Sequence, residues 1–169
     1  PTWSVCESIP MNDSLKLRTG PWRRYLDNWK DSLAHLGRAG VPVVCYNFMP
    51  ILDWMRTDLM YPVESGGYAV RFDRVAFAAF DLFLLKRPKA ERDYSDEVIR
   101  LAERQLKAMS PEQLAKLEAN IIGVFPAREE VYSRQGVLAR IAQFSELDAA
   151  TLRAHLVEFL TEVLPVAAD

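Results

Sequence analysis

Residues 41–46 read VPVVCY, an almost unbroken apolar run, and this stretch decides the fold. Such a run is typical of a strand that is covered on both faces, as in a parallel sheet. Upstream, residues 22–36 place apolar side chains at helical spacing, and residues 2–8 favour a first strand. The sequence therefore predicts a βαβ unit with a right-handed crossover. Open doubly wound sheets and closed barrels both contain this unit.

Turn-forming residues set the boundaries around this unit. The polar stretch 11–20 is predicted to be a long loop, and Gly37 and Gly40 are predicted to end the first helix. Alternation on either side of a Gly-Gly turn predicts a β-hairpin over residues 61–72. Asp73 is then expected to cap a helix that continues to about residue 86.

Residues 95–145 differ in character, because three helical patterns follow one another with no strand between them. The sequence SPEQ at residues 110–113 combines an N-cap serine, a proline at the first helical position and a capping-box glutamine. Asp148 is predicted to cap a final helix. The predicted organisation is a βαβα segment with the hairpin (1–94), a helical insertion (95–145) and a last helix (146–169).

Composition narrows the class of protein. The 169 residues correspond to about one domain, and the formal net charge of −2 gives no support for binding to nucleic acid or an anionic membrane. The two cysteines, Cys6 and Cys45, are too few for a disulfide framework, which indicates a reducing cytoplasm. Both lie in apolar runs and are predicted to be small buried hydrophobic residues.

The motifs of several enzyme classes are missing. The sequence contains no glycine-rich phosphate loop, no zinc-protease motif and no serine-hydrolase motif. Its two histidines, His35 and His155, fall within predicted helices and are expected to be surface or packing residues. This stretch by itself therefore does not supply a histidine-rich metal site.

Polar side chains follow both predicted strands. Glu7 comes at the end of the first and Asn47 at the end of the second, and ligands of parallel α/β proteins bind at these carboxyl ends. The alternative is that both residues only satisfy backbone groups of their own loops. Downstream, Arg56 either clamps a carboxylate or forms an internal ion pair with an aspartate. Trp54 either lines a pocket or anchors its loop.

Three segments of the chain resemble the D-mannonate dehydratase family. They are CESIP at residues 6–10, VVCYNFMP at residues 43–50 and DWMRTD at residues 53–58. The resemblance continues through the hairpin and the helical block to LPVA at residues 164–167, so it covers essentially the whole chain. Met55 departs from the expected pattern, in which a small polar residue stands at this position.

The resemblance implies an α/β fold, a partial (β/α)8 TIM barrel of the xylose-isomerase-like type with two parallel strands, a hairpin and a helical insertion. It implies a cytoplasmic hydro-lyase of glucuronate catabolism that converts D-mannonate to 2-dehydro-3-deoxy-D-gluconate. In that family histidine, cysteine and aspartate side chains hold a divalent metal, Mn²⁺ or Fe²⁺. None of those ligands, including the ligand cysteine, matches a residue of this sequence.

Only substrate-binding roles are assigned within this stretch. Asn47 is expected to donate a hydrogen bond, and Arg56 to hold the carboxylate of the substrate. Trp54 and Phe48 are expected to exclude water, and Glu7 is a weaker candidate for the same pocket. The general acid and the general base are expected to lie outside the chain.

The chain is expected to be an internal piece of a longer protein and to be inactive by itself. Its expected partners are a small sugar acid and, as one option, further copies of itself, with no nucleic acid and no membrane. The alternative function is a non-catalytic α/β scaffold or a helical protein-interaction module. In that case the block of residues 95–144 would bind a helix of a partner.

Overall fold

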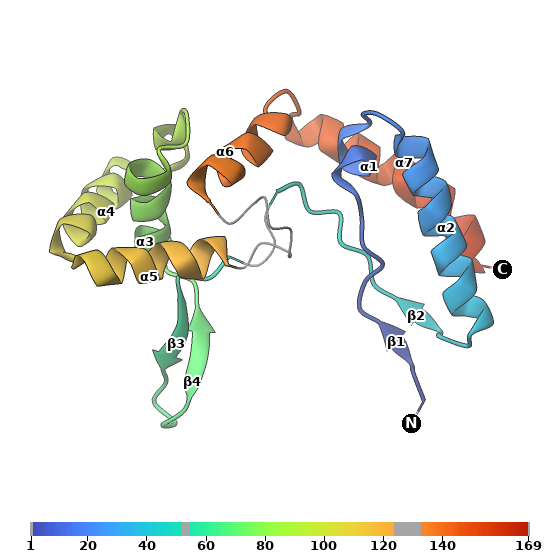
Figure 1. Cartoon of the computed structure of the whole chain (residues 1–169), viewed down its shortest axis with the longest axis horizontal. Coiled ribbons are helices and arrows are strands. Elements are labelled where there is room, and N and C mark those ends of the chain that lie inside the picture. Colours follow the sequence, from blue (N-terminus) through green and yellow to red (C-terminus); the bar gives the residue numbers. More distant parts are fainter. Residues whose placement is uncertain (1, 52–54, 124–132, 169) are drawn as a thin grey trace. The chain divides into compact units, whose positions relative to one another are not determined.

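The computed structural model describes residues 2–51, 55–123 and 133–168. The chain divides into two compact units, whose elements are labelled in Figure 1. Unit 1 comprises Pro1–Ile51 and Gln143–Asp169, and unit 2 comprises Leu52–Ala142. Unit 1 is therefore built from two separate segments of the sequence, whereas unit 2 is one continuous segment.

Unit 1 contains the predicted βαβ unit. The strands β1 (Val5–Cys6) and β2 (Val43–Val44) pair in parallel, and α2 (Trp22–Arg38) lies between them in the sequence. The prediction of two parallel strands joined by a helix is confirmed. Gly37 lies inside the last turn of α2, so only Gly40, with a φ of +79°, follows the end of the helix as predicted.

The core of unit 1 lies where α2 meets α7 (Ala149–Ala168). The rings of Trp29 and Phe159 meet edge to face with centroids 4.9 Å apart, and the Trp29 indole N–H donates to the carbonyl of Ile9. The other buried members of this cluster are Leu15, Leu26, Leu33 and Val163. Val44 packs against the cluster, so the core covers one side of β2.

The two-sided cover that the apolar run at residues 41–46 predicts for its strand is not supplied by the described residues of this chain. Each strand has only two residues, and Val43 is 49% exposed. The thiols are not buried as predicted either, because Cys45 is exposed and Cys6 is half-buried. The reason is that each strand has a single neighbour in the part of the chain that the structure describes. A strand with one neighbour leaves a face and an edge to solvent.

The polar stretch before α2 is not a continuous loop, which corrects a second prediction. Residues Asp13–Leu17 form a short helix, α1. The side chain of Asn12 caps it by accepting a hydrogen bond from the N–H of Ser14 at 2.9 Å. Leu15 is 1% exposed and anchors the helix in the core of unit 1.

Unit 2 begins with the predicted hairpin. The strand β3 (Asp58–Pro62) pairs antiparallel with β4 (Tyr68–Arg71), and Gly66 adopts a left-handed φ of +84° in the turn. A bulge interrupts the register between Asp58 and Tyr61. The hairpin prediction is confirmed, with β3 starting earlier than predicted.

Asp73 caps the helix that follows the hairpin, as predicted. Its carboxylate accepts from two backbone N–H groups at the start of α3 (Arg74–Ala79). A π-helical segment, η1 (Phe80–Leu85), continues from α3. This helical segment ends at Lys86, whose backbone is left-handed. A short 3₁₀ segment, η2 (Ala90–Asp93), follows.

Three helices then follow, and residues 95–123 and 133–143 contain no strand between them, as predicted. They are α4 (Asp96–Ala108), α5 (Pro111–Ile122) and α6 (Arg134–Gln143). The capping box at the start of α5 is confirmed, because Ser110 and Gln113 each accept the backbone N–H of the other. Among the residues that the structure describes, no helix is long and apolar enough to cross a membrane.

Candidate functional site

The carboxyl ends of β1 and β2 lie next to each other in unit 1. Cys6 pairs with Val44, and the N–H of Cys45 donates to the carbonyl of Cys6 at 2.9 Å, which extends the parallel pairing by one step. Glu7 and Asn47 therefore leave the sheet from neighbouring strands. Glu7 is exposed and Asn47 is half-buried. This placement is the one from which parallel α/β proteins contact ligands.

Phe48 lies just beyond Asn47 and packs inward. Its ring centroid is 5.9 Å from that of Phe159, and it joins the partly buried shell around the core of unit 1. This contact holds the loop after β2 against α7. Trp54, the other aromatic residue assigned to the pocket, lies outside the described residues.

Arg56 belongs to unit 2 and is half-buried. The next residue, Thr57, forms hydrogen bonds through both its hydroxyl and its backbone carbonyl. The hydroxyl of Thr57 donates to the carbonyl of Arg71 at 3.1 Å and accepts from the N–H of Asp73 at 2.8 Å. The carbonyl of Thr57 accepts from the side-chain amide of Asn120 at 3.0 Å. These bonds fix the chain directly after Arg56 to the hairpin, α3 and α5.

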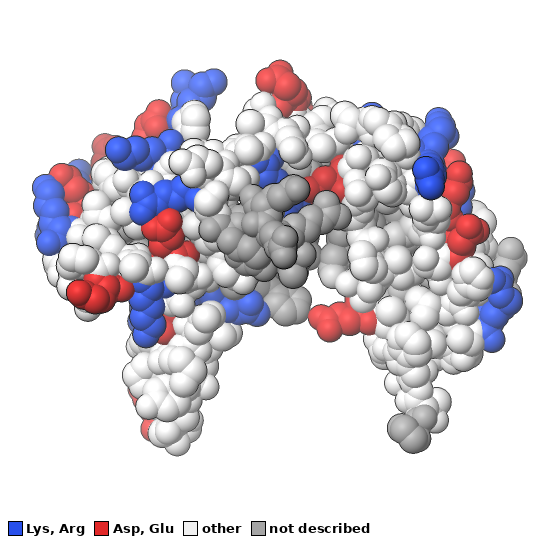
Figure 2. All heavy atoms as spheres, in the orientation of Figure 1, with Lys and Arg blue, Asp and Glu red and all other residues white. Residues whose placement is uncertain are grey.

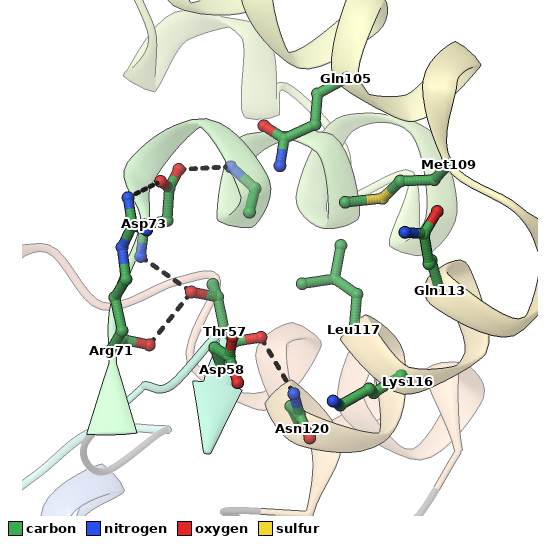
Figure 3. Close-up of a pocket in the computed structure, with 11 residues that line it drawn as sticks. Thr57, Asp58, Arg71, Asp73, Gln105, Met109, Gln113, Lys116, Leu117 and Asn120 are labelled. Atoms are coloured by element: carbon green, nitrogen blue, oxygen red, sulfur yellow. Dashed lines mark hydrogen bonds and ion pairs between the residues drawn. The ribbon is translucent and has the colours of Figure 1, made fainter. Parts of the chain in front are cut away.

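Thr57, Arg71 and Asp73 form one wall of a polar cleft in unit 2, shown in Figure 3. The cleft has a volume of about 270 Å³. Its far side is formed by side chains of α4 and α5, among them Gln105, Gln113 and Lys116. The ion pair between Arg71 and Asp73, 2.7 Å long, closes one end.

The cleft combines the cationic side chains of Lys116 and Arg71 with the carboxylates of Asp58 and Asp73 and with several amides, so its formal charges balance. No local sequence pattern predicts this cleft. The one local indication of a polar site is Asn120. This polar residue lies beside Leu117 and Ile121 in an otherwise apolar stripe of the helix. Its partner, Thr57, lies 63 residues away in the sequence, so no local pattern links them.

A buried ionic cluster lies beside η1 and η2 and was also missed. Asp81 is 2% exposed, and it accepts from the guanidinium of Arg87 at 2.7 Å and from the hydroxyl of Tyr94 at 2.8 Å. Arg87 also binds Asp93 at 2.7 Å. These side chains form hydrogen bonds with one another, so we interpret the cluster as stabilising the turn between η1 and η2 rather than as a ligand site.

Alkaline pH is expected to destabilise this cluster through Tyr94. Burial, followed by the hydrogen bond to Asp81, raises the pKa of Tyr94 above the ordinary 10.0. The folded protein therefore holds the phenol proton more tightly than the unfolded chain, and this stabilisation is complete below about pH 10 and is lost above it. We expect the unfolding free energy of the wild type to decline above pH 10 more steeply than that of Tyr94→Phe.

The matched control for this measurement is Tyr46→Phe, which removes an exposed phenol and keeps the ring near Phe159. Denaturant titrations at several pH values between 8 and about 11 bracket the ordinary tyrosine pKa. The control should follow the wild type. Equal slopes for wild type and Tyr94→Phe would refute the assignment.

A parallel strand pair with a connecting helix, together with an antiparallel hairpin and further helices, defines a mixed α/β protein. The mixed α/β prediction is thus confirmed. The chain belongs to the D-mannonate dehydratase (UxuA) family, because the sequence model of that family matches residues 2–169.

Known proteins are similar over nearly the whole chain. Mannonate dehydratase 2 of Agrobacterium fabrum is 46% identical over 167 residues, which are 99% of this chain and 42% of that protein. Mannonate dehydratase of Rhizobium meliloti is 44% identical over 165 residues, 98% of this chain and 41% of that protein. The chain therefore spans about two fifths of the length of these curated relatives.

A solved structure supports the fold. The crystal structure of mannonate dehydratase from Streptococcus suis serotype 2 matches with a TM-score of 0.58 at 24% sequence identity. The match covers 98% of this chain and 33% of that one. At this level of identity the likeness concerns the fold alone.

The described residues of this chain supply no ligand set for the divalent metal that the family resemblance implies. Across ranges 2–51, 55–123 and 133–168, no three histidine, cysteine, aspartate or glutamate side chains come together as ligands. His35 is exposed on α2. The Nδ1 of His155 lies 2.7 Å from the carbonyl of Lys16 and is thereby engaged in packing α7 against α1. No catalytic step is therefore assigned to a metal held by these residues.

Proposed function

We propose that this chain is part of a mannonate dehydratase, a hydro-lyase that eliminates water from D-mannonate to give 2-dehydro-3-deoxy-D-gluconate. The observation that carries the proposal is the family match over residues 2–169. The parallel pairing of β1 and β2 supports it, because such folds bind ligands at the carboxyl ends of their strands, and Glu7 and Asn47 directly follow these strands in the sequence.

The complete protein is proposed to be a (β/α)8 barrel of the xylose-isomerase-like type, of which this chain supplies a part. A groove of about 720 Å³ runs beside β2 and is lined by Val41, Val43, Val44 and the end of α7 at Val166. An apolar groove beside an exposed strand suits a further parallel strand. Within this proposal residues 1–94 and 146–169 belong to the barrel, and residues 95–145 are a helical insertion.

The chemistry sets what the pocket must supply. The elimination removes a proton from the carbon beside the carboxylate and expels hydroxide from the next carbon, and the resulting enol tautomerises to the 2-keto acid. Negative charge develops on the carboxylate oxygens of the substrate as the proton leaves. A fixed cation or hydrogen-bond donor beside these oxygens therefore lowers the activation barrier of the elimination. A base must accept the proton, and an acid must protonate the departing hydroxyl.

Arg56 is proposed to bind the substrate carboxylate through two parallel N–H···O bonds, which a guanidinium favours geometrically. Asn47 is proposed to donate to a substrate hydroxyl from the end of β2. Phe48 and Trp54 are proposed to exclude water, and Glu7 to contact the sugar acid at the end of β1. The base and the acid are proposed to lie in other parts of the complete protein.

The Mn²⁺ or Fe²⁺ ion that the resemblance implies is proposed to bind ligands outside this chain. When bound, such an ion supplies positive charge toward developing negative charge on the substrate. This chain's contribution would be limited to holding and orienting the sugar acid.

The proposal is tested by incubating the full-length protein with D-mannonate and following the formation of the 2-keto-3-deoxy acid. We expect turnover with D-mannonate, loss of turnover after chelation, and recovery with Mn²⁺ or Fe²⁺. A second sugar acid that differs only in the configuration at carbon 2 serves as the matched substrate control. The absence of product from D-mannonate with either metal would refute the proposed function.

A further inference from the structure

The side chains of β2 and of the residues directly after it alternate between two faces. Val44 packs against the core of unit 1. The ring centroid of Phe159 in α7 lies 6.3 Å from that of Tyr46 and 5.9 Å from that of Phe48. Residues 44, 46 and 48 are two positions apart, which is the spacing of one face of an extended chain. This is the face that α7 covers.

The residues between them belong to the opposite face, and they are Val43, Cys45 and Asn47. The parallel register places Val5 of β1 beside Val43. The N–H of Cys45 donates to the carbonyl of Cys6, and this bond continues the register to Glu7 beside Cys45. The two valines, Glu7 and Cys45 are all exposed. The uncovered face of the strand pair therefore carries Glu7 and Cys45 next to each other, and Asn47 follows.

The uncovered face changes from apolar to polar toward the carboxyl ends of the strands. It begins with Val5 beside Val43, and the visible side of the strand pair near the N-terminus carries no charged side chain in Figure 2. It ends with Glu7 and Asn47. In a (β/α)8 barrel the helices lie outside, apolar side chains fill the interior in layers, and ligands bind at the carboxyl ends of the strands. Within the proposed barrel, Glu7 therefore belongs to the polar layer that contacts the ligand.

The carboxylate of Glu7 is available to a ligand. It is exposed, and within residues 2–51, 55–123 and 133–168 no group forms a hydrogen bond or an ion pair with it. Its neighbour Cys45 has a small side chain, which leaves the carboxylate accessible. A carboxylate accepts hydrogen bonds but does not donate them, so it binds hydroxyl groups and repels a second carboxylate. Glu7 is therefore suited to the hydroxylated end of a sugar acid.

We propose that Glu7 is a specificity-determining residue that accepts a hydrogen bond from the terminal hydroxyl group, on carbon 6, of D-mannonate. This inference rests on the proposed function and extends it, because it fixes the direction in which the substrate lies. Carbon 6 is the carbon farthest from the substrate carboxylate, so the repulsion between that carboxylate and Glu7 is weakest in this orientation. Asn47, which both donates and accepts, then binds a hydroxyl group nearer the middle of the substrate.

The test compares D-mannonate with its 6-deoxy analogue, which lacks only the terminal hydroxyl group. The full-length protein is assayed with its metal, and kcat/KM is measured for each acid. A hydrogen bond to a charged group is among the stronger ones in proteins. We therefore expect the wild type to prefer D-mannonate on the order of 10- to 100-fold.

The preference should depend on Glu7. In Glu7→Ala we expect kcat/KM for D-mannonate to fall by about the wild-type preference, while kcat/KM for the analogue changes little. The ratio of the two values then falls to about 1. Glu7→Gln keeps the size and one acceptor oxygen but loses the charge, so its ratio should lie between those of the wild type and Glu7→Ala.

The matched control is Asp31→Ala, which removes another exposed carboxylate of unit 1, on α2. Its ratio should equal that of the wild type. Partial unfolding of a variant lowers both rates by the same factor, because both acids are assayed on the same preparation. The ratio therefore reports on the contact between Glu7 and the substrate and not on the stability of the variant.

The outcomes separate this inference from the function on which it rests. Without product from D-mannonate in the wild type, the proposed function fails and this assignment fails with it. If the wild type dehydrates D-mannonate but Glu7→Ala keeps the wild-type ratio, only the assignment of Glu7 is overturned. Equal use of the two acids by the wild type overturns it as well. Loss of both activities in Glu7→Ala, together with an unchanged ratio in Glu7→Gln, would also refute the contact with the terminal hydroxyl group.

Discussion

Replacing Asp81 by alanine is expected to lower the free energy of unfolding by about 3 kcal/mol. The carboxylate is 2% exposed and accepts from both Arg87 and Tyr94, so its loss leaves two polar groups without their main partner. Breaking a buried pair by removing one partner costs about 3–5 kcal/mol. We expect the lower end, because Arg87 is partly exposed and keeps its bond to Asp93.

Hydrogen exchange of the full-length protein gives the local readout for this prediction. The amides of residues 80–94 should exchange faster in Asp81→Ala than in the wild type, because this cluster fixes η1 against η2. Glu103→Ala removes a carboxylate from an exposed ion pair with Lys107 on α4 and serves as the control. Exchange in residues 80–94 that matches the wild type would show that the cluster does not stabilise the turn.

Replacing Arg56 by alanine in the full-length protein is expected to raise the KM for D-mannonate about 100-fold. The proposed role is a two-bonded clamp on the substrate carboxylate, and alanine removes both the charge and the hydrogen bonds. Arg56→Lys keeps the charge but not the planar fork, so we expect a smaller rise, on the order of 10-fold. Initial rates over a range of substrate concentrations separate KM from kcat.

The control for the Arg56 variants is Arg134→Ala. Arg134 also makes a two-bonded contact, but with Glu118 on the surface of unit 2, so its loss should leave KM unchanged. The two interpretations of Arg56 predict different results. If Arg56 serves only in an internal ion pair, Arg56→Ala lowers the melting temperature and leaves KM at the wild-type value, and the proposed clamp is refuted.

Local features of the fold could be predicted from the sequence, because adjacent residues encode them. The N-caps at Asp73 and Ser110 depend on bonds that span two or three residues, and both are found as predicted. The hairpin follows from alternation around a glycine turn for the same reason. The parallel pairing of β1 and β2 followed from the apolar run and the helix before it.

Features that depend on distant partners could not be predicted. The covering of β2 depends on elements that the apolar pattern does not specify, so Val43 and Cys45 are exposed although their neighbours suggested burial. The polar cleft depends on Thr57 and Asn120, and the ionic cluster on Asp81 and residues up to 13 positions away. The helix α1 was missed because its five residues are too few to show a helical repeat, and of its two leucines only Leu15 is buried.

The division of unit 1 into two segments has a consequence for the order of events during synthesis on the ribosome. Phe159 of α7 completes the core around Trp29, yet all of unit 2 is translated between the two. Unit 2 is one continuous segment, so its folding does not have to wait for residues that follow Ala142. Until α7 has been synthesised, the apolar side chains of the β1–β2 segment that pack against it remain exposed to solvent. We expect chaperones that bind exposed hydrophobic segments to bind this segment during that interval.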